Sequence, residues 1–169
     1  RSALPPESSA PSRVFDLTSR DGMKLSGRIT LPIETKRPPL IVRVGPGLPG
    51  PRAYHRFDAV AQYLASRGFA SVRVHVRGTA GFGTAWQRAG DLQLATGMVH
   101  DLEDAVEWLG QQEWIDVARV ALWSEGAAGI VAAHAGLSPV FRALINIDGP
   151  MFTRAYDLSQ LSPSDRADE

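Results

Sequence analysis

Two short runs of alternating apolar and polar residues open the patterned part of the chain. The runs cover residues 14–17 and 24–31, and the segment Ser19-Arg20-Asp21-Gly22 separates them. Asp-Gly between alternating runs favours a tight turn, because glycine adopts a positive φ at little steric cost. Pro32 then removes a backbone donor and ends the second run. The pattern predicts an N-terminal β-hairpin.

Beyond the hairpin, short apolar runs alternate with segments of helical periodicity. The runs are rich in β-branched residues and predict buried strands at residues 40–44, 70–76, 119–123 and 141–147. The periodic segments predict helices at residues 53–67, 101–109 and 130–135. Asp101 and Glu103 would stand in the first turn of the second helix, where their charges complement the helix dipole. Strands that alternate with helices predict an α/β fold with a mostly parallel sheet covered on both faces.

Local composition divides the chain into three parts. Residues 1–12 are rich in Pro, Ser and Ala and predict a flexible lead-in, of a kind found after a removed signal peptide or in an interdomain linker. Residues 13–150 carry the strand and helix patterns, and residues 151–169 form a polar tail. The absence of Cys fits the cytoplasm as well as an extracytoplasmic compartment, and the lead-in favours the latter.

The overall composition is that of a folded domain without a broad charged surface. Of 169 residues, 44% are hydrophobic, which is enough apolar material to offset the entropy of ordering the chain. Eighteen basic residues balance eighteen acidic ones, which argues against a nucleic-acid or anionic-membrane footprint. No apolar run approaches the roughly 18 residues of a transmembrane helix. The zero Cys count excludes disulfides, a Cys-ligated metal and a Cys nucleophile.

Chemistry in such sheets lies at the carboxyl ends of the strands, and the first of these ends is rich in glycine. Gly45-Pro46-Gly47-Leu48-Pro49-Gly50 matches a dinucleotide-binding fingerprint between a strand and a helix. Pro46 and Pro49 each remove an N–H that would face a pyrophosphate. The segment therefore predicts a plain Gly/Pro loop, with nucleotide binding as the alternative. A second Gly-rich segment, residues 77–83, predicts a structural loop.

The third strand end has the layout of a nucleophile elbow, a sharp turn between a strand and a helix of small residues. Counting from the strand at residues 119–123, the apex falls on Gly126, and Ser124 and Ala128 take the two small positions. Glycine has no side chain that could attack a carbonyl. The alternative nucleophile is Ser124, which would require an elbow two residues earlier, with Leu122 where a small residue is needed.

Other candidate catalytic groups are few. Asp148 follows the last predicted strand, on the correct edge for an acid partner, although Asp-Gly-Pro is also an ordinary turn sequence. A serine mechanism needs a general base, and the histidines are His55, His75, His100 and His134. None falls in a late loop able to fold over the elbow, so we expect surface or packing roles for them. No His, Asp or Glu cluster has ligand spacing, so neither a metal nor a cofactor is expected.

Four phrases of the sequence carry a family resemblance. They are residues 63–70 (YLASRGFA), 77–83 (RGTAGFG), 98–109 (MVHDLEDAVEWL) and 115–122 (IDVARVAL). In this order and spacing they resemble the peptidase domain of the prolyl oligopeptidase family, with its dipeptidyl- and acylaminoacyl-peptidase relatives. The resemblance runs from about Val14 to Pro150 and implies a truncated α/β-hydrolase-type fold.

The departures from the family pattern fall at the expected active site. The resemblance places an oxyanion loop, His-Gly-Gly-Pro in relatives, at Gly45-Pro46-Gly47. It places the serine of Gly-x-Ser-x-Gly-Gly at Gly126, and Ala127 would then carry a further oxyanion-hole N–H. It also implies that the family's acid and histidine come after residue 169. These differences imply an incomplete catalytic triad.

Three hypotheses follow for the function. The first is a degenerate, non-catalytic peptidase-like domain with a binding or assembly role, whose bare sheet edge is covered by a protein partner or by a further C-terminal segment. The second is a fragment of a serine hydrolase that cleaves peptide or ester bonds, with Ser124 as nucleophile and the Glu125 N–H as an oxyanion donor. The third is a nucleotide-binding module that uses residues 45–50.

Overall fold

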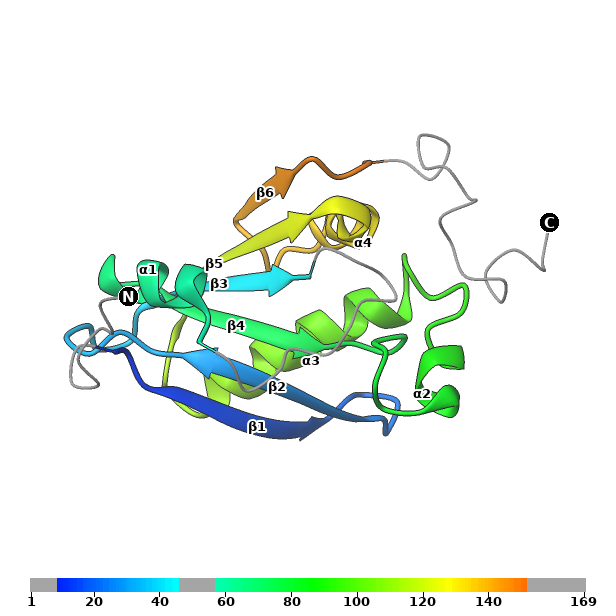
Figure 1. The fold of residues 1–169 in the computed structure, drawn as a ribbon, viewed down its shortest axis with the longest axis horizontal. Helices are drawn as coiled ribbons and strands as arrows, with labels where there is room; N and C mark the ends of the chain where they lie inside the picture. Colours follow the sequence, from blue (N-terminus) through cyan, green and yellow to red (C-terminus); the bar gives the residue numbers. More distant parts are fainter. Residues whose placement is uncertain (1–8, 46–56, 152–169) are drawn as a thin grey trace.

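A six-stranded sheet forms the middle of the computed structural model, which describes residues 9–45 and 57–151 (Figure 1). The strands are β1 (Ser12–Thr18), β2 (Lys24–Thr30), β3 (Pro39–Val44), β4 (Ala70–His75), β5 (Asp116–Glu125) and β6 (Ala143–Ile147). Their order across the sheet is β1-β2-β4-β3-β5-β6. Each strand overlaps a segment where the hydrophobic pattern predicts one.

The sheet is antiparallel on its N-terminal side and parallel elsewhere. β1 and β2 pair antiparallel, with Leu17 opposite Leu25, and form the predicted hairpin. β2 is also antiparallel to β4, whereas β4, β3, β5 and β6 run parallel to one another. The arrangement confirms the predicted α/β class with a mostly parallel sheet.

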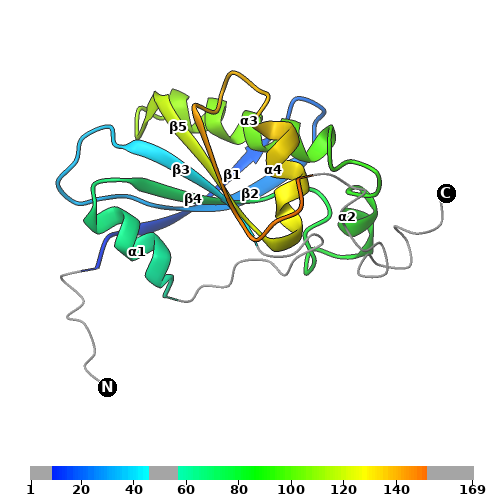
Figure 2. The same ribbon diagram turned by 90° about the horizontal axis from the view of Figure 1, so that it is seen from above.

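Helices cover both faces of the sheet (Figure 2). α1 (Ala59–Ser66) lies against β4 and β2 on one face, whereas α3 (Gly97–Gln111) and α4 (Gly129–Ala135) lie on the other face and contact each other. α2 (Thr84–Arg88) is a short helix between β4 and α3, and η2 (Gly126–Ala128) joins β5 to α4. Connections between parallel strands are right-handed, so the reversal of strand order at β3 places α1 and α3 on opposite faces.

All three predicted helices begin at other residues than predicted, and α4 differs least, since it begins at Gly129. α1 begins at Ala59, and Asp58 caps it by accepting a hydrogen bond from the Ala61 N–H at 2.9 Å. Of the predicted helix at 53–67, residues 53–56 lie outside the described residues, and Phe57 is exposed and not helical. α3 begins at Gly97, so the prediction that Asp101 and Glu103 lie in its first turn is wrong. Among the described helices, none is long and apolar enough to cross a membrane.

One apolar core fills the space between the sheet and the pair α3–α4. Leu102 and Leu109 of α3 are fully buried there, together with Val42 and Val72 of the central strands. Burying one such side chain contributes about 1.5–3 kcal/mol relative to exposing it. Phe15 of β1 extends the same layer, since its ring stacks on Trp108 of α3 with centroids 5.2 Å apart. This packing holds the strand ends in fixed positions.

Candidate functional site

The carboxyl ends of the parallel strands meet at one edge of the sheet, as their arrowheads in Figure 1 show. The residues that follow β3, β4, β5 and β6 are Gly45, Val76, Gly126 and Asp148. Ligands of open α/β sheets bind outside this edge. The structure therefore places the candidate residues Gly45, Gly126 and Asp148 on the same side of the molecule.

The turn between β5 and α4 is the sharp strand-to-helix connection predicted for an elbow. Glu125 ends β5 in an extended conformation, Gly126 follows with φ +58°, and α4 begins at Gly129. A side chain in this left-handed region costs about 1–2 kcal/mol, which a glycine avoids. Ala127 lies in η2 directly after Gly126. The backbone of an elbow is present, and its apex carries no side chain.

The loop after β6 packs tightly against this elbow. A Cβ added to Gly129 would lie 2.8 Å from the Pro150 carbonyl oxygen and 2.9 Å from Asn146 Oδ1. A Cβ added to Gly149 would lie 2.6 Å from the Gly126 carbonyl oxygen. Gly129 and Gly149 are thus required because the backbone of the loop after β6 lies close to the backbone of the elbow. Asp148, next to Gly149, is exposed and has φ +52°, as expected for a turn residue.

Ser124 lies inside the fold rather than at the sheet edge. Its side chain has 0% relative exposure, and its Oγ donates a hydrogen bond to Asn146 Oδ1 at 2.9 Å. Asn146 Nδ2 in turn donates to the Gly149 carbonyl oxygen at 2.7 Å. This chain of bonds ties the end of β5 to the turn after β6. A substrate carbonyl reaches the Ser124 hydroxyl only if this packing opens.

Of the loop after β3, only its first residue, Gly45, belongs to the described residues. Gly45 is described, and a Cβ added there would lie 3.8 Å from Arg73 Nη1. Pro46 and Gly47 of the predicted oxyanion loop lie outside the described residues, and so does the rest of the segment up to Gly50. The oxyanion-loop and nucleotide-binding interpretations of residues 45–50 both remain predictions.

The described histidines lie on three separate elements. His75 is at the end of β4 and its ring lies 5.2 Å from that of Phe82, whereas His100 and His134 are exposed on α3 and α4. His55 lies outside the described residues. Among residues 9–45 and 57–151, no group of three or more His, Asp or Glu side chains is arranged to hold a metal ion.

A buried ion-pair network supports the loop after β4. Asp101 of α3 is fully buried and accepts hydrogen bonds from the Arg77 backbone N–H at 2.8 Å, from Nε at 3.0 Å and from Nη2 at 2.7 Å. Arg77 Nη1 also lies 2.8 Å from Asp21 Oδ2 in the hairpin turn. The hydrogen bonds to Asp101 raise the pKa of Arg77 against the opposing effect of burial. A hydrogen bond from Arg77, and then one from Ser19, lowers the pKa of Asp21 well below its usual range.

Neither this network nor the role of Asn146 was predictable from the sequence pattern. The signal for the network was Arg77 at the end of a predicted strand and Asp101 on the next predicted helix. That signal is weak, because Asp101 also suits a helix N-terminus. Asn146 gave no signal, since a polar residue in an edge strand is ordinary.

The matches to known proteins agree with this geometry. Residues 55–166 match the model of the Prolyl oligopeptidase family. Dipeptidyl aminopeptidase BIII of Pseudoxanthomonas mexicana is 31% identical over 151 residues, which are 83% of this chain and 22% of that protein.

Solved structures give the same result. A puromycin-hydrolyzing peptidase of Mycobacterium tuberculosis superposes with a TM-score of 0.79 at 25% identity, over 86% of this chain and 23% of that one. The acylaminoacyl peptidase of Pyrococcus horikoshii superposes with a TM-score of 0.75 at 25% identity, over 83% and 23% of the two chains. This chain thus spans less than a quarter of the length of these relatives. Its fold corresponds to part of an α/β-hydrolase domain, and the chain belongs to the prolyl oligopeptidase family.

Proposed function

We propose that this chain is a non-catalytic member of the prolyl oligopeptidase family with a binding or assembly role. The observation that carries the proposal is Gly126, which stands at the apex of the turn between β5 and α4 with φ +58°. Nucleophilic catalysis needs a side chain at this point that attacks the carbonyl and is activated by a base. Without a nucleophile, only the modest rate enhancement from oxyanion donors and binding remains.

Ser124 is a poor replacement for the nucleophile in this arrangement. Its hydroxyl is fully buried and donates to Asn146 Oδ1, an amide oxygen that cannot serve as a general base. An activated serine instead needs a base such as histidine within hydrogen-bond reach. The burial and the partner of Ser124 both favour a structural role.

A fluorophosphonate probe applied to the full chain tests the proposal. We expect no covalent labelling of the native protein, since neither Gly126 nor buried Ser124 offers an activated hydroxyl. The Ser124→Ala variant is the test variant. Ser66→Ala, which removes an exposed hydroxyl of α1 that donates to the Tyr63 carbonyl oxygen, is the matched control.

Labelling of the native chain would contradict the proposal. If labelling disappears in Ser124→Ala and persists in Ser66→Ala, the chain is instead part of a serine hydrolase that acts on peptide or ester bonds. Labelling that persists in both variants would identify a different nucleophile and would also overturn the non-catalytic function.

The assembly role is supported by the last strand of the described sheet. Within the described residues, β6 pairs with β5 alone, so its other edge has no strand beside it. Ile145 and Ile147 of β6 are 40% and 45% exposed, which is high for apolar side chains in a strand. An uncovered strand edge with apolar side chains is a template for pairing. We propose that an extended protein segment pairs with β6.

Sedimentation of the full chain over a wide range of concentrations tests this part of the proposal. We expect concentration-dependent association, because an uncovered apolar edge self-pairs when no partner is present. Ile145→Lys should weaken the association, since a charge on an edge strand opposes pairing. Leu137→Lys, at an exposed position outside β6, is the control. A stable monomer at all concentrations would contradict the proposed pairing surface.

A further inference from the structure

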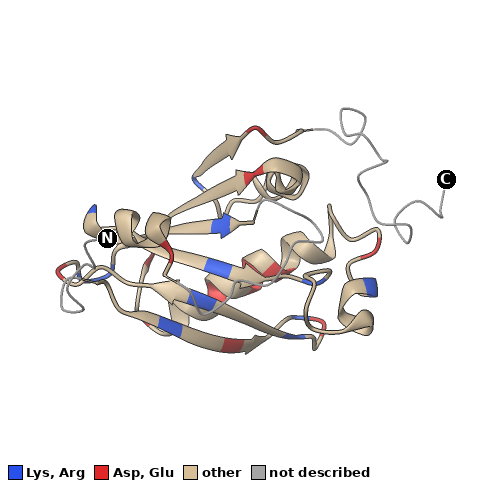
Figure 3. Cartoon of the chain, in the orientation of Figure 1, with Lys and Arg blue, Asp and Glu red and all other residues tan. Residues whose placement is uncertain are grey.

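Three arginines from separate parts of the sequence lie side by side on the sheet. Arg28 of β2 is directly opposite Arg73 of β4, and Arg73 is in turn paired with Arg43 of β3. Figure 3 shows basic residues as blue bands on neighbouring strands of the sheet. Directly paired residues point to the same face of a sheet, so the three side chains share one face. We call this set, Arg28, Arg73 and Arg43, the arginine row.

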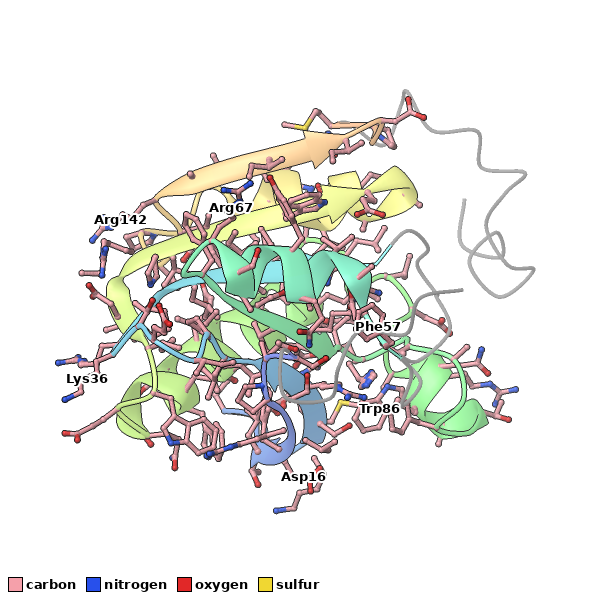
Figure 4. All side chains as sticks on the ribbon, turned by 60° about the vertical axis from the view of Figure 1, so that its left-hand side comes forward. Asp16, Lys36, Phe57, Arg67, Trp86 and Arg142 are labelled. Carbon is pink, nitrogen blue, oxygen red and sulfur yellow. The ribbon has the colours of Figure 1, made fainter. Side chains whose placement is uncertain are left out.

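The arginine row lies beneath the start of α1. Asp58, which caps α1, has its Oδ2 2.8 Å from Arg43 Nη1 and 3.5 Å from Arg73 Nε. Figure 4 shows α1 across this face, with Phe57 beyond one end of the helix and Arg67 beyond the other. Arg73 Nη1 also lies 3.8 Å from the position of a Cβ on Gly45. The row is therefore next to the carboxyl end of β3, close to the candidate site.

Arg43 is buried and Arg28 and Arg73 are partly buried, and the row has too few hydrogen-bond acceptors for its donors. The Arg43 side chain is only 3% exposed and that of Arg73 is 29% exposed. Three of the buried nitrogens have no hydrogen-bond partner among residues 9–45 and 57–151: Arg28 Nη1, Arg43 Nε and Arg73 Nε. The 3.5 Å contact between Arg73 and Asp58 is a charge contact without hydrogen-bond geometry. Buried donors of charged groups are normally paired, so this shortage requires an explanation.

The row also carries more positive than negative charge. Asp58 is the one carboxylate among the described residues that forms ion pairs with it. Burial, and next the charge of Arg43, lower the pKa of Arg73, while Asp58 and Glu125 act in the opposite direction. Like charges directly opposite each other on a sheet are destabilising. A purely structural row would use all of its donors within the fold, whereas here Arg43 Nη1 bonds to Asp58 and three other buried nitrogens have no partner among the described residues.

We propose that the arginine row is an anion-binding site that takes one oxyanion group, a carboxylate or a phosphate, from a bound ligand. Guanidinium groups present parallel N–H donors that match both kinds of oxyanion. One anion would supply acceptors for the unpartnered donors and would reduce the repulsion between Arg73 and its two neighbours. The site uses none of the elbow residues, so it stands independently of the proposed function.

Calorimetric titration and thermal unfolding of the full chain test the site at constant ionic strength. The probes are inorganic phosphate, acetylglycine, and acetylglycine amide as the uncharged counterpart. We expect saturable binding and a rise in Tm with phosphate or with acetylglycine, and neither effect with the amide. Whichever of the two charged probes binds more tightly identifies the oxyanion.

The Arg73→Gln variant tests whether the arginine row is responsible. Removing one charged hydrogen-bond partner should weaken binding by about tenfold or more. Arg142→Gln, at an exposed position just before β6, is the control with the same change of charge and should bind like the native chain. If Arg73→Gln does not fold, Arg28→Gln removes a member of the row that forms no ion pair within the described residues and should show the same loss.

Two results would overturn the proposal. The first is the absence of binding and of stabilisation by both charged probes. The second is an equal rise in Tm for the native chain and the row variants, which would indicate a general salt effect. Both readouts measure binding, so a labelled serine in the fluorophosphonate experiment would not affect this conclusion.

Discussion

Replacing Asp101 by alanine is expected to lower the free energy of unfolding by about 3–5 kcal/mol, the usual result of breaking a buried ion pair from one side. Asp101 is fully buried and accepts three hydrogen bonds from Arg77. Without it, the Arg77 guanidinium keeps only the partly exposed Asp21 as an ionic partner among the described residues. The expected loss therefore reflects an incompletely compensated buried cation.

Urea denaturation of the native chain and the variant measures this loss. Asp116→Ala is the matched control, since Asp116 forms an exposed pair with Arg119 at 2.7 Å and should cost at most about 1 kcal/mol. Asp101→Asn keeps an acceptor for the Arg77 N–H. Its loss in free energy of unfolding should fall between those of Asp101→Ala and Asp116→Ala. A loss for Asp101→Ala no larger than that of the control would show that the network contributes little to stability.

Replacing the neighbouring residue, Leu102, by alanine should lower the free energy of unfolding by about 2–5 kcal/mol. Leu102 is fully buried in the core between α3 and the sheet. The change removes apolar contact and leaves a cavity that the surrounding strands can fill only in part. The substitutions at Asp101 and Leu102 thus measure the polar and the apolar contacts of the same turn of α3 separately.

The same denaturation experiment measures the second effect. Leu137→Ala, at a side chain that is 85% exposed, is the control and should change stability by less than about 0.5 kcal/mol. Leu102→Met, which roughly conserves volume, should cost less than about 1.5 kcal/mol. A Leu102→Ala loss equal to that of the exposed control would contradict the packing of α3 on the sheet.

The strands were predictable because their signals are local. Residues 40–44 form a β-branched run between Pro and Gly, and this run alone indicates a buried strand. The start of α3 was not predictable from local sequence. Gly97 is a weak helix former, and it lies in the helix because tertiary packing requires a glycine there. A Cβ on Gly97 would lie 2.8 Å from Arg77 Nε, so glycine is needed there by a contact distant in sequence. No window of sequence around residue 97 contains that information.

The candidate site also has features that were predictable from local sequence and features that were not. The elbow turn at Gly126 was predictable, because a strand followed by a run of small residues specifies it locally. The burial of Ser124 was not predictable, because its hydroxyl bonds to Asn146, which lies 22 residues later in the sequence. The arginine row depends on the register of three strands, and Arg28, Arg43 and Arg73 are far apart in the sequence. Pairing register is a property of the whole sheet and leaves no mark near any one residue.

Gly126 has a further consequence for how this sequence can evolve. Any other residue at φ +58° would carry backbone strain of about 1–2 kcal/mol, and active sites commonly hold such strain at the expense of stability. The glycine relaxes that strain while leaving the course of the turn intact. The chain therefore gains tolerance for destabilising substitutions elsewhere in the fold. A serine introduced at residue 126 would carry that strain, so the Gly126→Ser variant should be less stable than the native chain.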